Sequence, residues 1–346
     1  RKPWLLTFTA ACVGFTALLW FVRPAPDFVL LALGLYVMAS ITYHFAIVFY
    51  DAMLKSIAPR KLLGRVSGWG WATGYAGGLA CLILCLWLVY GGGPVSLGLD
   101  AEVAEPVRAT VVLAAIWFAI FSIPLFLLVP DRPNSGLSLL AATKAGLRQL
   151  PDAVSILRRS PSILRFLISH MLYTDGLVTL FAFGGIYAAA EFGMTTTDIL
   201  IFGIVLNVAA GAGAAAFAWI DDVIGSKNTI LLSLAGLLIG TCGLIVAESL
   251  LLFWGFATIL GLFVGPAQAA GRSLMARLAP EGIETEMFGL YALAGKATAF
   301  IGPLILGIAV QWSGSQRAGL VVVMAFLLAG LFVLISVREP RSPDPI

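Results

Sequence analysis

The chain has 346 residues, of which 60% are hydrophobic and 11% charged, with a formal net charge of +3 and a mean hydropathy of +0.99. Water-soluble domains carry about 25% charged residues and about 45–50% apolar ones, and a soluble fold of this size could not bury so much apolar surface. The composition therefore excludes a soluble protein and predicts helices that lie in lipid.

Ten apolar blocks follow one another along the chain. A helix needs about 20 apolar residues to cross the hydrocarbon core, and in lipid its backbone polar groups must be satisfied within the segment. Each block therefore predicts a transmembrane helix, and the fold class is an all-α integral membrane bundle. In chain order the blocks cover residues 4–22, 28–50, 69–90, 109–129, 164–190, 197–219, 229–247, 249–271, 287–310 and 318–336.

Basic residues gather on alternate sides of these predicted helices. If the first residue is cytoplasmic, 17 of the 21 Lys and Arg residues fall in inner loops. The outer loops hold Arg23, Arg108 and Arg317, and Lys296 lies within a block. Cytoplasmic loops carry such an excess, so we predict that both termini of this chain are cytoplasmic, at the inner membrane if the source is a bacterium.

The longest inner loop separates four blocks from six. Its leucines recur at helical intervals among Lys and Arg residues, which predicts a short amphipathic helix on the membrane face. We expect a four-span half at 1–130, a linker at 131–162, a six-span half at 163–338 and a cytoplasmic tail at 339–346.

Two inner loops are similar after a shift of 221 positions. The matching residues are Ala58-Pro59 with Gly68 and Gly74, and Ala279-Pro280 with Gly289 and Gly295. Repeated halves are typical of secondary transporters, whose substrate site lies between the repeats. If the halves are equivalent, two further spans are expected before Arg1; a naturally shorter protein is the alternative.

These features resemble the major facilitator superfamily, which has twelve spans in two six-helix halves. Its loop motif Gly-x-x-x-Asp-Arg-x-Gly-Arg-Arg-Lys is partly matched by Asp222, Gly225 and Lys227. Ala218 and Val223 stand in place of the leading Gly and the Arg. The resemblance implies a bundle of this type, with about ten of twelve helices present.

Four clusters are similar to the branch related to the vacuolar amino-acid effluxer of yeast autophagy. They are Phe49-Tyr50-Asp51-Ala52 with Ile57-Ala58-Pro59, Gly64-Arg65-Val66-Ser67-Gly68 and Gly74-Tyr75; Tyr173-Thr174-Asp175-Gly176; Gly265-Pro266-Ala267-Gln268 with Arg272-Ser273-Leu274; and Phe288-Gly289-Leu290-Tyr291 with Gly295-Lys296 and Gly302-Pro303-Leu304. The resemblance covers nearly all of the chain. It implies amino-acid export in the founding yeast member, and a cavity lined by the first, fourth, seventh and tenth helices.

Two ionisable residues lie well inside predicted spans. Asp175 is about twelve residues into its span and Lys296 about nine, a difference in depth of about 5 Å at 1.5 Å per residue. They could therefore meet. Charges inside the membrane are costly and by default indicate function, so Asp175 is a candidate carrier of a proton or cation, or an anchor for an amine. Lys296 is a candidate carboxylate ligand, and a fixed ion pair between helices is the alternative.

Further polar residues complete the candidate site. His170, Tyr173 and Thr174 share one helical face, whereas Asp175 points away from His170. His44 lies in the span that corresponds to the family's cavity-lining fourth helix, and either histidine could titrate near neutral pH. Gln268 is a candidate ligand on the tenth helix of the family. Simple packing roles are the alternative for each.

Charges at the ends of inner loops are candidates for a gate. Asp51 with Arg65, and Asp222 with Lys227 beside Gly225, could form ion pairs that favour one transport state. Arg272 shares a face with Gln268 and joins this group, although it could simply extend to the membrane interface. Ordinary solvated loop charges are the alternative interpretation. Separately, Gly70, Gly74 and Gly78, and likewise Gly261 and Gly265, recur every four residues and predict close contact between helices.

We predict a secondary active transporter of a small solute, an amino acid or similar zwitterion, that works by alternating access with possible proton coupling. A non-transporting receptor or scaffold with the same fold, or a transporter of another solute class, is the alternative. The four cysteines and two histidines have no metal-ligand spacing, and the sequence has no Walker motif. We therefore expect no enzyme activity, cofactor, metal or nucleic acid, and a monomer in the bilayer.

Overall fold

The computed structural model describes every residue except 92–96, 101–102, 132–154, 156, 158 and 341–346. In the described residues all regular structure is helical, as the composition predicts. The predicted amphipathic helix between 131 and 162 lies almost wholly outside the described residues.

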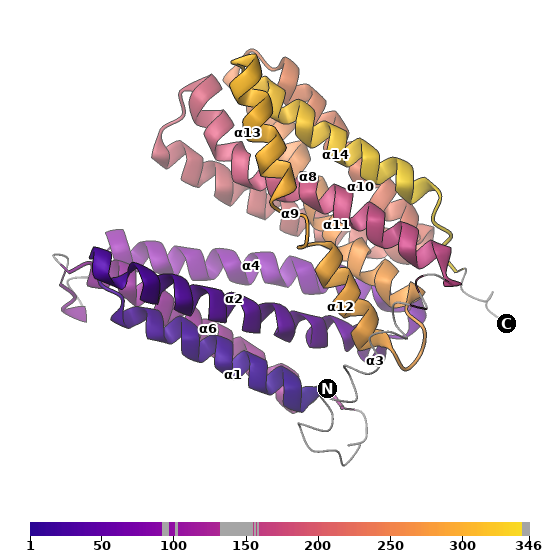
Figure 1. Ribbon diagram of the computed structural model, residues 1–346, viewed down its shortest axis with the longest axis horizontal. Coiled ribbons are helices and arrows are strands. Elements are labelled where there is room, and N and C mark those ends of the chain that lie inside the picture. Colours follow the sequence, from indigo (N-terminus) through magenta and orange to yellow (C-terminus); the bar gives the residue numbers. More distant parts are fainter. Residues whose placement is uncertain (92–96, 101–102, 132–154, 156, 158, 341–346) are drawn as a thin grey trace. The chain divides into compact units, whose positions relative to one another are not determined.

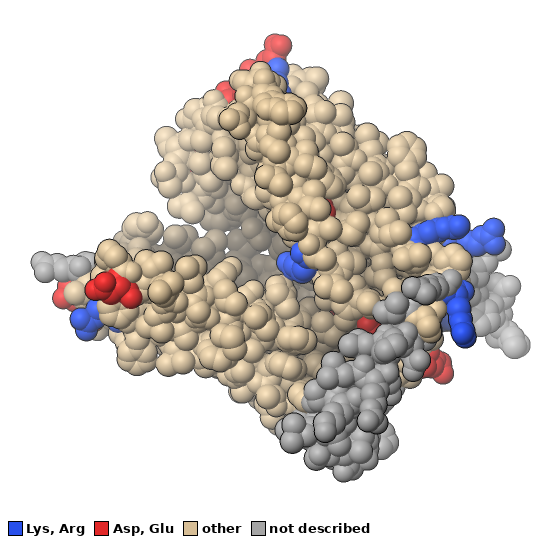
Figure 2. Space-filling model, in the orientation of Figure 1, with Lys and Arg blue, Asp and Glu red and all other residues tan. Residues whose placement is uncertain are grey.

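Nine described helices are long and apolar enough to cross a membrane, and they match nine of the ten predicted blocks. They are α1 (Lys2–Leu18), α2 (Val29–Ala52), α4 (Leu63–Tyr90), α6 (Glu105–Leu128), α8 (Pro161–Phe192), α9 (Thr196–Ile224), α10 (Ser226–Val246), α11 (Leu250–Leu278) and α14 (Arg317–Ile335). Short helices connect them at Leu19–Phe21, Pro26–Phe28, Leu54–Ile57 (α3) and Arg60–Leu62. On the face shown in Figure 2, neutral side chains cover most of the surface and charged ones gather mainly near helix ends, as contact with lipid requires.

The ninth predicted span, at 287–310, is not one helix. It consists of α12 (Glu284–Ala294) and α13 (Ile301–Ser313), which are joined by the non-helical residues 295–300 (Figure 1). Pro303 has no N–H group, so the carbonyl of Ala299 lacks its helical donor, and Gly295 ends α12. Lys296 lies in the interruption with an exposed side chain.

The chain divides into two compact units, and the boundary cuts through α4. One unit comprises Arg1–Met53 and the stretch from Gly77, and the other comprises Leu54–Ala76 with the chain from α8 onward. In the first unit α1 packs against α2 and α6. Its core is built on Leu5, Ala46 and Met53.

The second unit contains α8 to α14 and the first part of α4. In it α11 packs between α9 and α10, while α14 packs against α8, α10 and α13. The unit therefore places the first part of α4 beside α9 and α11, although α4 lies more than 100 positions before them in the sequence.

Gly213 of α9 and Gly265 of α11 bring these helices into backbone contact. A Cβ on Gly213 would overlap the carbonyl of Leu262, and one on Gly265 would overlap the carbonyl of Ala210. The predicted close contact is confirmed at Gly261 and Gly265, because small residues let two membrane helices approach. At Gly74 and Gly78 it is wrong, since a Cβ there would meet no described atom within 4 Å.

We expect Gly213→Ala to lower the free energy of unfolding by about 1–3 kcal/mol, because extra volume in a packed contact costs this much. Gly203→Ala in the same helix is the matched control, since a Cβ there meets nothing within 4 Å. Thermal unfolding in detergent should separate the two variants by several degrees. Equal unfolding temperatures would contradict the described contact between α9 and α11.

Candidate functional site

Asp222, near the end of α9, binds the beginning of α4. Its Oδ1 accepts hydrogen bonds from the backbone N–H groups of Gly64 at 2.9 Å and of Arg65 at 3.3 Å. The Arg65 side chain adds an ion pair at 3.5 Å. The first N–H groups of a helix have no partner within the helix and carry partial positive charge, so a carboxylate is stabilised there.

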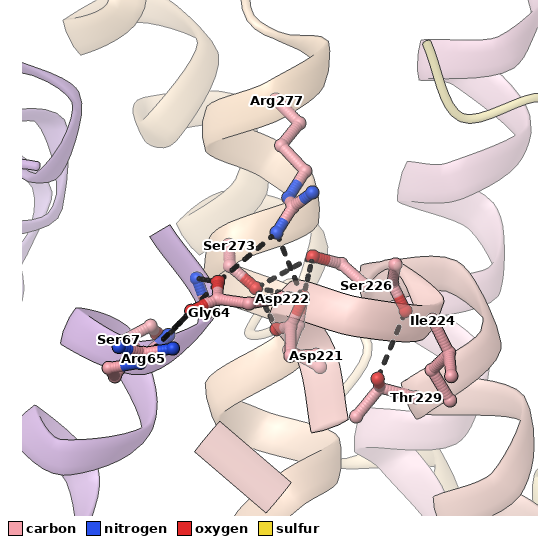
Figure 3. Close-up of polar contacts among 12 residues, drawn as sticks. Gly64, Arg65, Ser67, Asp221, Asp222, Ile224, Ser226, Thr229, Ser273 and Arg277 are labelled. Atoms are coloured by element: carbon pink, nitrogen blue, oxygen red, sulfur yellow. Dashed lines mark hydrogen bonds and ion pairs between the residues drawn. The ribbon is translucent and has the colours of Figure 1, made fainter. Parts of the chain in front are cut away.

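Asp221, the neighbouring carboxylate, is the centre of a buried polar cluster (Figure 3). It accepts hydrogen bonds from the hydroxyls of Ser226, at 2.6 Å, and Ser273. Arg277 of α11 lies 3.2 Å from Asp221 and 3.7 Å from Asp222. One guanidinium therefore balances two adjacent carboxylates.

Glu339, which follows α14, is the third carboxylate around Arg277, at 3.5 Å. It also accepts the backbone N–H groups of Ser226 at 3.1 Å and Lys227 at 2.8 Å, so it caps the beginning of α10. Gly225 makes room for this contact, because its φ is +87° and a Cβ there would lie 2.9 Å from Glu339 Oε2. This position requires glycine on both grounds.

Lys227 does not pair with Asp222, in contrast to the ion pair considered from the sequence. Its Nζ donates instead to the carbonyl of Ile335, at 2.8 Å. The partners of Asp222 are Arg65 and Arg277. Residues five positions apart across the sharp turn between α9 and α10 therefore face different neighbours.

Two more polar contacts hold α4 against α11. The guanidinium of Arg272 is buried and donates from Nε to Ser67 Oγ at 2.9 Å, and from Nη2 to the Ser67 carbonyl at 3.0 Å. Further along, the hydroxyl of Tyr75 donates to Gln268 Oε1 at 2.6 Å. Arg272 is thus a buried link between helices and not a side chain that reaches the membrane interface.

We call this row of contacts the α4 seam. It consists of Gly64, Arg65, Ser67 and Tyr75 on α4, with Asp222, Arg272 and Gln268 as their partners on α9 and α11. Between the polar contacts, Gly68 lies against Ala218 so closely that a Cβ would overlap it. The contacts of the α4 seam are hydrogen bonds and an ion pair, which depend on direction. The side chains are small where α4 and α9 approach most closely.

An apolar cavity of about 820 Å³ lies in the second unit among α8, α9 and α11. Phe202, Gly203 and Phe253 are part of its wall, and Asn207 and Tyr75 contribute polar atoms. Because Tyr75 also bonds Gln268, the cavity adjoins one end of the α4 seam. Ligand sites commonly have volumes of about 300–1,000 Å³ and few polar groups.

The predicted meeting of Asp175 and Lys296 is not seen. Asp175 is 2% exposed and Lys296 is exposed, and the two form no ion pair in the described structure. Asp175 Oδ1 has no hydrogen-bond partner among the described residues. The turn that interrupts the ninth predicted span leaves Lys296 exposed.

His170, Tyr173 and Thr174 do lie together, as their spacing predicts. His170 Nδ1 is hydrogen-bonded to the Tyr173 hydroxyl at 2.9 Å and to the Thr174 hydroxyl at 3.2 Å. The ring of Tyr291 stacks on His170 with the centroids 3.9 Å apart. A Cβ on Gly271 would be 2.7 Å from the hydroxyls of both Tyr173 and Tyr291, so α8, α11 and α12 converge there.

His44 and Asp51 belong to the first unit, on α2. The His44 ring packs against Tyr43 with the centroids 5.5 Å apart. Asp51 is half-buried near the end of the helix.

Several residues of the site were not predicted from the sequence. They are Ser67, Asp221, Ser226, Ser273, Arg277 and Glu339. An adjacent acidic pair at Asp221-Asp222 followed by Arg277 at the end of a later apolar block was a usable signal, because isolated charges beside a membrane need partners. The sequence gives no comparable indication for Ser67, Ser226 and Ser273.

Comparisons with known proteins agree with this architecture. The sequence model of the family described as "Vacuole effluxer Atg22 like" matches residues 56–344. The chain is 25% identical over 350 residues to "Uncharacterized MFS-type transporter YxiO" of Bacillus subtilis (strain 168), covering 99% of this chain and 79% of that protein. It is also 25% identical over 307 residues to autophagy-related protein 22-2 of Emericella nidulans, covering 80% of this chain. It spans about half the length of that fungal relative, with 50% covered.

A solved structure shows the same fold. The crystal structure of the E. coli fucose:proton symporter matches with a TM-score of 0.72, covering 98% of this chain and 84% of the symporter chain. The two sequences are 14% identical.

Proposed function

Because the chain belongs to the vacuole effluxer Atg22-like family of major-facilitator transporters, we propose that it moves a small zwitterionic solute of the amino-acid class by alternating access. The chain is a multi-pass membrane transporter, and the relatives it matches are transporters and not enzymes. The predicted fold and family are therefore confirmed. The solute and its coupling are our proposal.

The observation that carries the proposal is the cavity next to the α4 seam. The cavity is large enough for an amino acid, and its apolar wall suits a side chain while Tyr75 and Asn207 offer hydrogen bonds. Tyr75 belongs to both features, since it lines the cavity and bonds Gln268. A solute that displaces this hydroxyl would weaken the seam directly.

The α4 seam is the proposed gate. The first part of α4 is bound to the second unit, whereas the rest of the same helix belongs to the first. Movement of α4 away from α9 and α11 would break the contacts at Asp222, Arg272 and Gln268. By the distribution of Lys and Arg, this end of the bundle faces the cytoplasm, so the gate would open inward.

The experiment that tests the proposal is uptake of a panel of radiolabelled amino acids into proteoliposomes that hold the full-length protein. We expect saturable uptake that a proton gradient accelerates, and at least about tenfold slower uptake for Asp175→Asn, because a lone buried carboxyl in a membrane is costly to keep without a task. Asp198→Asn, at the capping box that begins α9, is the control and should transport normally.

Absence of uptake for every amino acid, with the protein shown to be folded, would contradict the proposed solute class. Normal uptake by Asp175→Asn would remove Asp175 from the path while leaving transport intact. A receptor or scaffold would show no uptake and would tolerate both substitutions.

A further inference from the structure

The interruption between α12 and α13 faces a buried carboxyl of α8. Asp175 is 2% exposed, and its Oδ1 is buried without a hydrogen-bond partner among the described residues. Across from it, Thr298 lies in the non-helical residues 295–300, and its buried hydroxyl also has no hydrogen-bond partner there. Gly295 and Gly302, on either side of Thr298, lie against α8 beside Thr174 and beside the backbone oxygen of Asp175, so Thr298 and Asp175 are on facing segments.

In the described part of the chain, no charged side chain forms an ion pair with Asp175. On α8, His170 and Tyr173 are bonded to each other. The sequence of α13 has no ionisable side chain, and α14 has Arg317, which lies at the far end of that helix and pairs with Glu191 at 3.9 Å. Lys296 is exposed. An ionised carboxylate in this position is strongly unfavourable until a cation or a proton neutralises it.

The backbone beside Asp175 offers further oxygen atoms. Residues 295–300 are outside the helices, and within them the carbonyls of Lys296 and Thr298 accept the backbone N–H groups of Ala299 and Ile301. Pro303 removes the donor that a helix would give to the carbonyl of Ala299. The end of α12 contributes the negative end of its dipole. Unwound carbonyls, a helix C-terminus and a carboxylate are the groups with which interrupted membrane helices bind Na⁺ or H⁺.

We propose that Asp175, Thr298 and the peptide carbonyls between α12 and α13 form a binding site for a small monovalent cation, held either as a proton on the carboxyl or as a sodium ion. The site lies wholly within the second unit. It rests on the proposed function, for which it supplies the coupling ion.

A cation bound at this site would affect how α12 and α13 pack against α8, because the contacts around the site are tight. A Cβ on Gly302, at the start of α13, would lie 3.1 Å from the backbone oxygen of Asp175 and would overlap the hydroxyl of Thr179. Gly295, at the other end of the interruption, would meet His170 Nε2 at 2.9 Å. Both ends of the interruption thus touch α8, so a cation bound between them fixes α12 and α13 against that helix.

The test measures cation binding directly, on purified protein in lipid nanodiscs without solute or gradient. Infrared spectroscopy detects the C=O stretch of a protonated carboxyl, first with choline as the salt cation and then with Na⁺. Binding of ²²Na⁺ is measured by scintillation proximity. The variants are Asp175→Asn, Thr298→Val and Thr298→Ser, with Asp27→Asn as the control at an exposed carboxyl.

A proton site predicts a carboxyl band that Asp175→Asn abolishes and Na⁺ leaves unchanged. A sodium site predicts a band that Na⁺ removes, together with saturable ²²Na⁺ binding that Asp175→Asn abolishes. In either case Thr298→Val should change the affinity about tenfold, because a hydroxyl bonded to a charged group is commonly worth that much. Thr298→Ser and Asp27→Asn should behave as the wild type.

The proposal is overturned if the wild type shows neither an Asp175-dependent band nor ²²Na⁺ binding, or if Thr298→Val leaves both unchanged. The result is separable from the transport assay. Cation binding without amino-acid uptake would support the cation site and contradict the proposed solute. Amino-acid uptake without cation binding would support the proposed solute and contradict the cation site.

Discussion

Replacing Arg277 by methionine is expected to lower the free energy of unfolding by about 3–5 kcal/mol, the cost of removing one partner from a buried ion pair. The Arg277 side chain is 9% exposed and lies within 3.7 Å of three carboxylates, on Asp221, Asp222 and Glu339. Without it, these carboxylates repel one another in a site from which water is largely excluded. This repulsion would destabilise the end of α9, the beginning of α10 and the segment after α14 together.

Arg317→Met is the matched control, since Arg317 pairs with Glu191 at 3.9 Å and is 42% exposed. Exposed ion pairs contribute about 0–1 kcal/mol, so its unfolding temperature should stay near that of the wild type. Arg277→Lys should fall between the two, because it keeps the charge but loses the planar fork that reaches several carboxylates. Thermal unfolding in detergent checks all three, and equal stability of the two methionine variants would contradict a structural role for the cluster.

The spans were predictable because lipid imposes one simple condition on the sequence. A helix that crosses the membrane needs a long apolar stretch, and nine of the ten predicted blocks are single long helices. The block at 287–310 shows the limit of that reasoning. The block reads as one apolar stretch, but Gly295 and Pro303 allow the backbone to leave the helical conformation. Hydropathy describes the polarity of side chains, so it does not detect a loss of backbone hydrogen bonds.

The α4 seam shows a second limit. Closeness in sequence favours an ion pair between Lys227 and Asp222, whereas the partners of Asp222 in the structure come from α4 and α11. Which basic side chain pairs with a carboxylate near the end of a helix depends on the direction in which each side chain points. Sequence spacing gives that direction within one helix, as at His170 and Tyr173. Sequence spacing does not give the direction between side chains of different helices, such as Asp222 on α9 and its partners on α4 and α11.

Asp175 can be identified from the sequence as a candidate residue, whereas Thr298 cannot. A charge within an apolar block is conspicuous in the sequence. Thr298 is one of many threonines in apolar segments, where the hydroxyl usually bonds a carbonyl of its own helix, as in Thr179 and Thr241. Its hydroxyl lacks that partner because the helix is interrupted around it, and only the structure shows the interruption.

Gly203→Trp is expected to abolish saturable uptake, or to slow it at least about tenfold, because the loss of about 1.4 kcal/mol of solute binding already changes affinity tenfold. Gly203 is part of the cavity wall, and a Cβ there meets nothing within 4 Å. The indole would therefore project into open space and occupy volume that the proposed solute needs. The backbone of α9 would not have to move.

Gly255→Trp on α11 is the matched control, since it is exposed, has no atom within 4 Å of its Cβ position and is not part of the cavity wall. Both variants add the same side chain to an open position, so they should unfold at similar temperatures. Uptake should separate them, with Gly255→Trp near the wild type. If both transported normally, the solute would have to pass outside the cavity among α8, α9 and α11, and the role proposed for Tyr75 at the end of the α4 seam would fall with it.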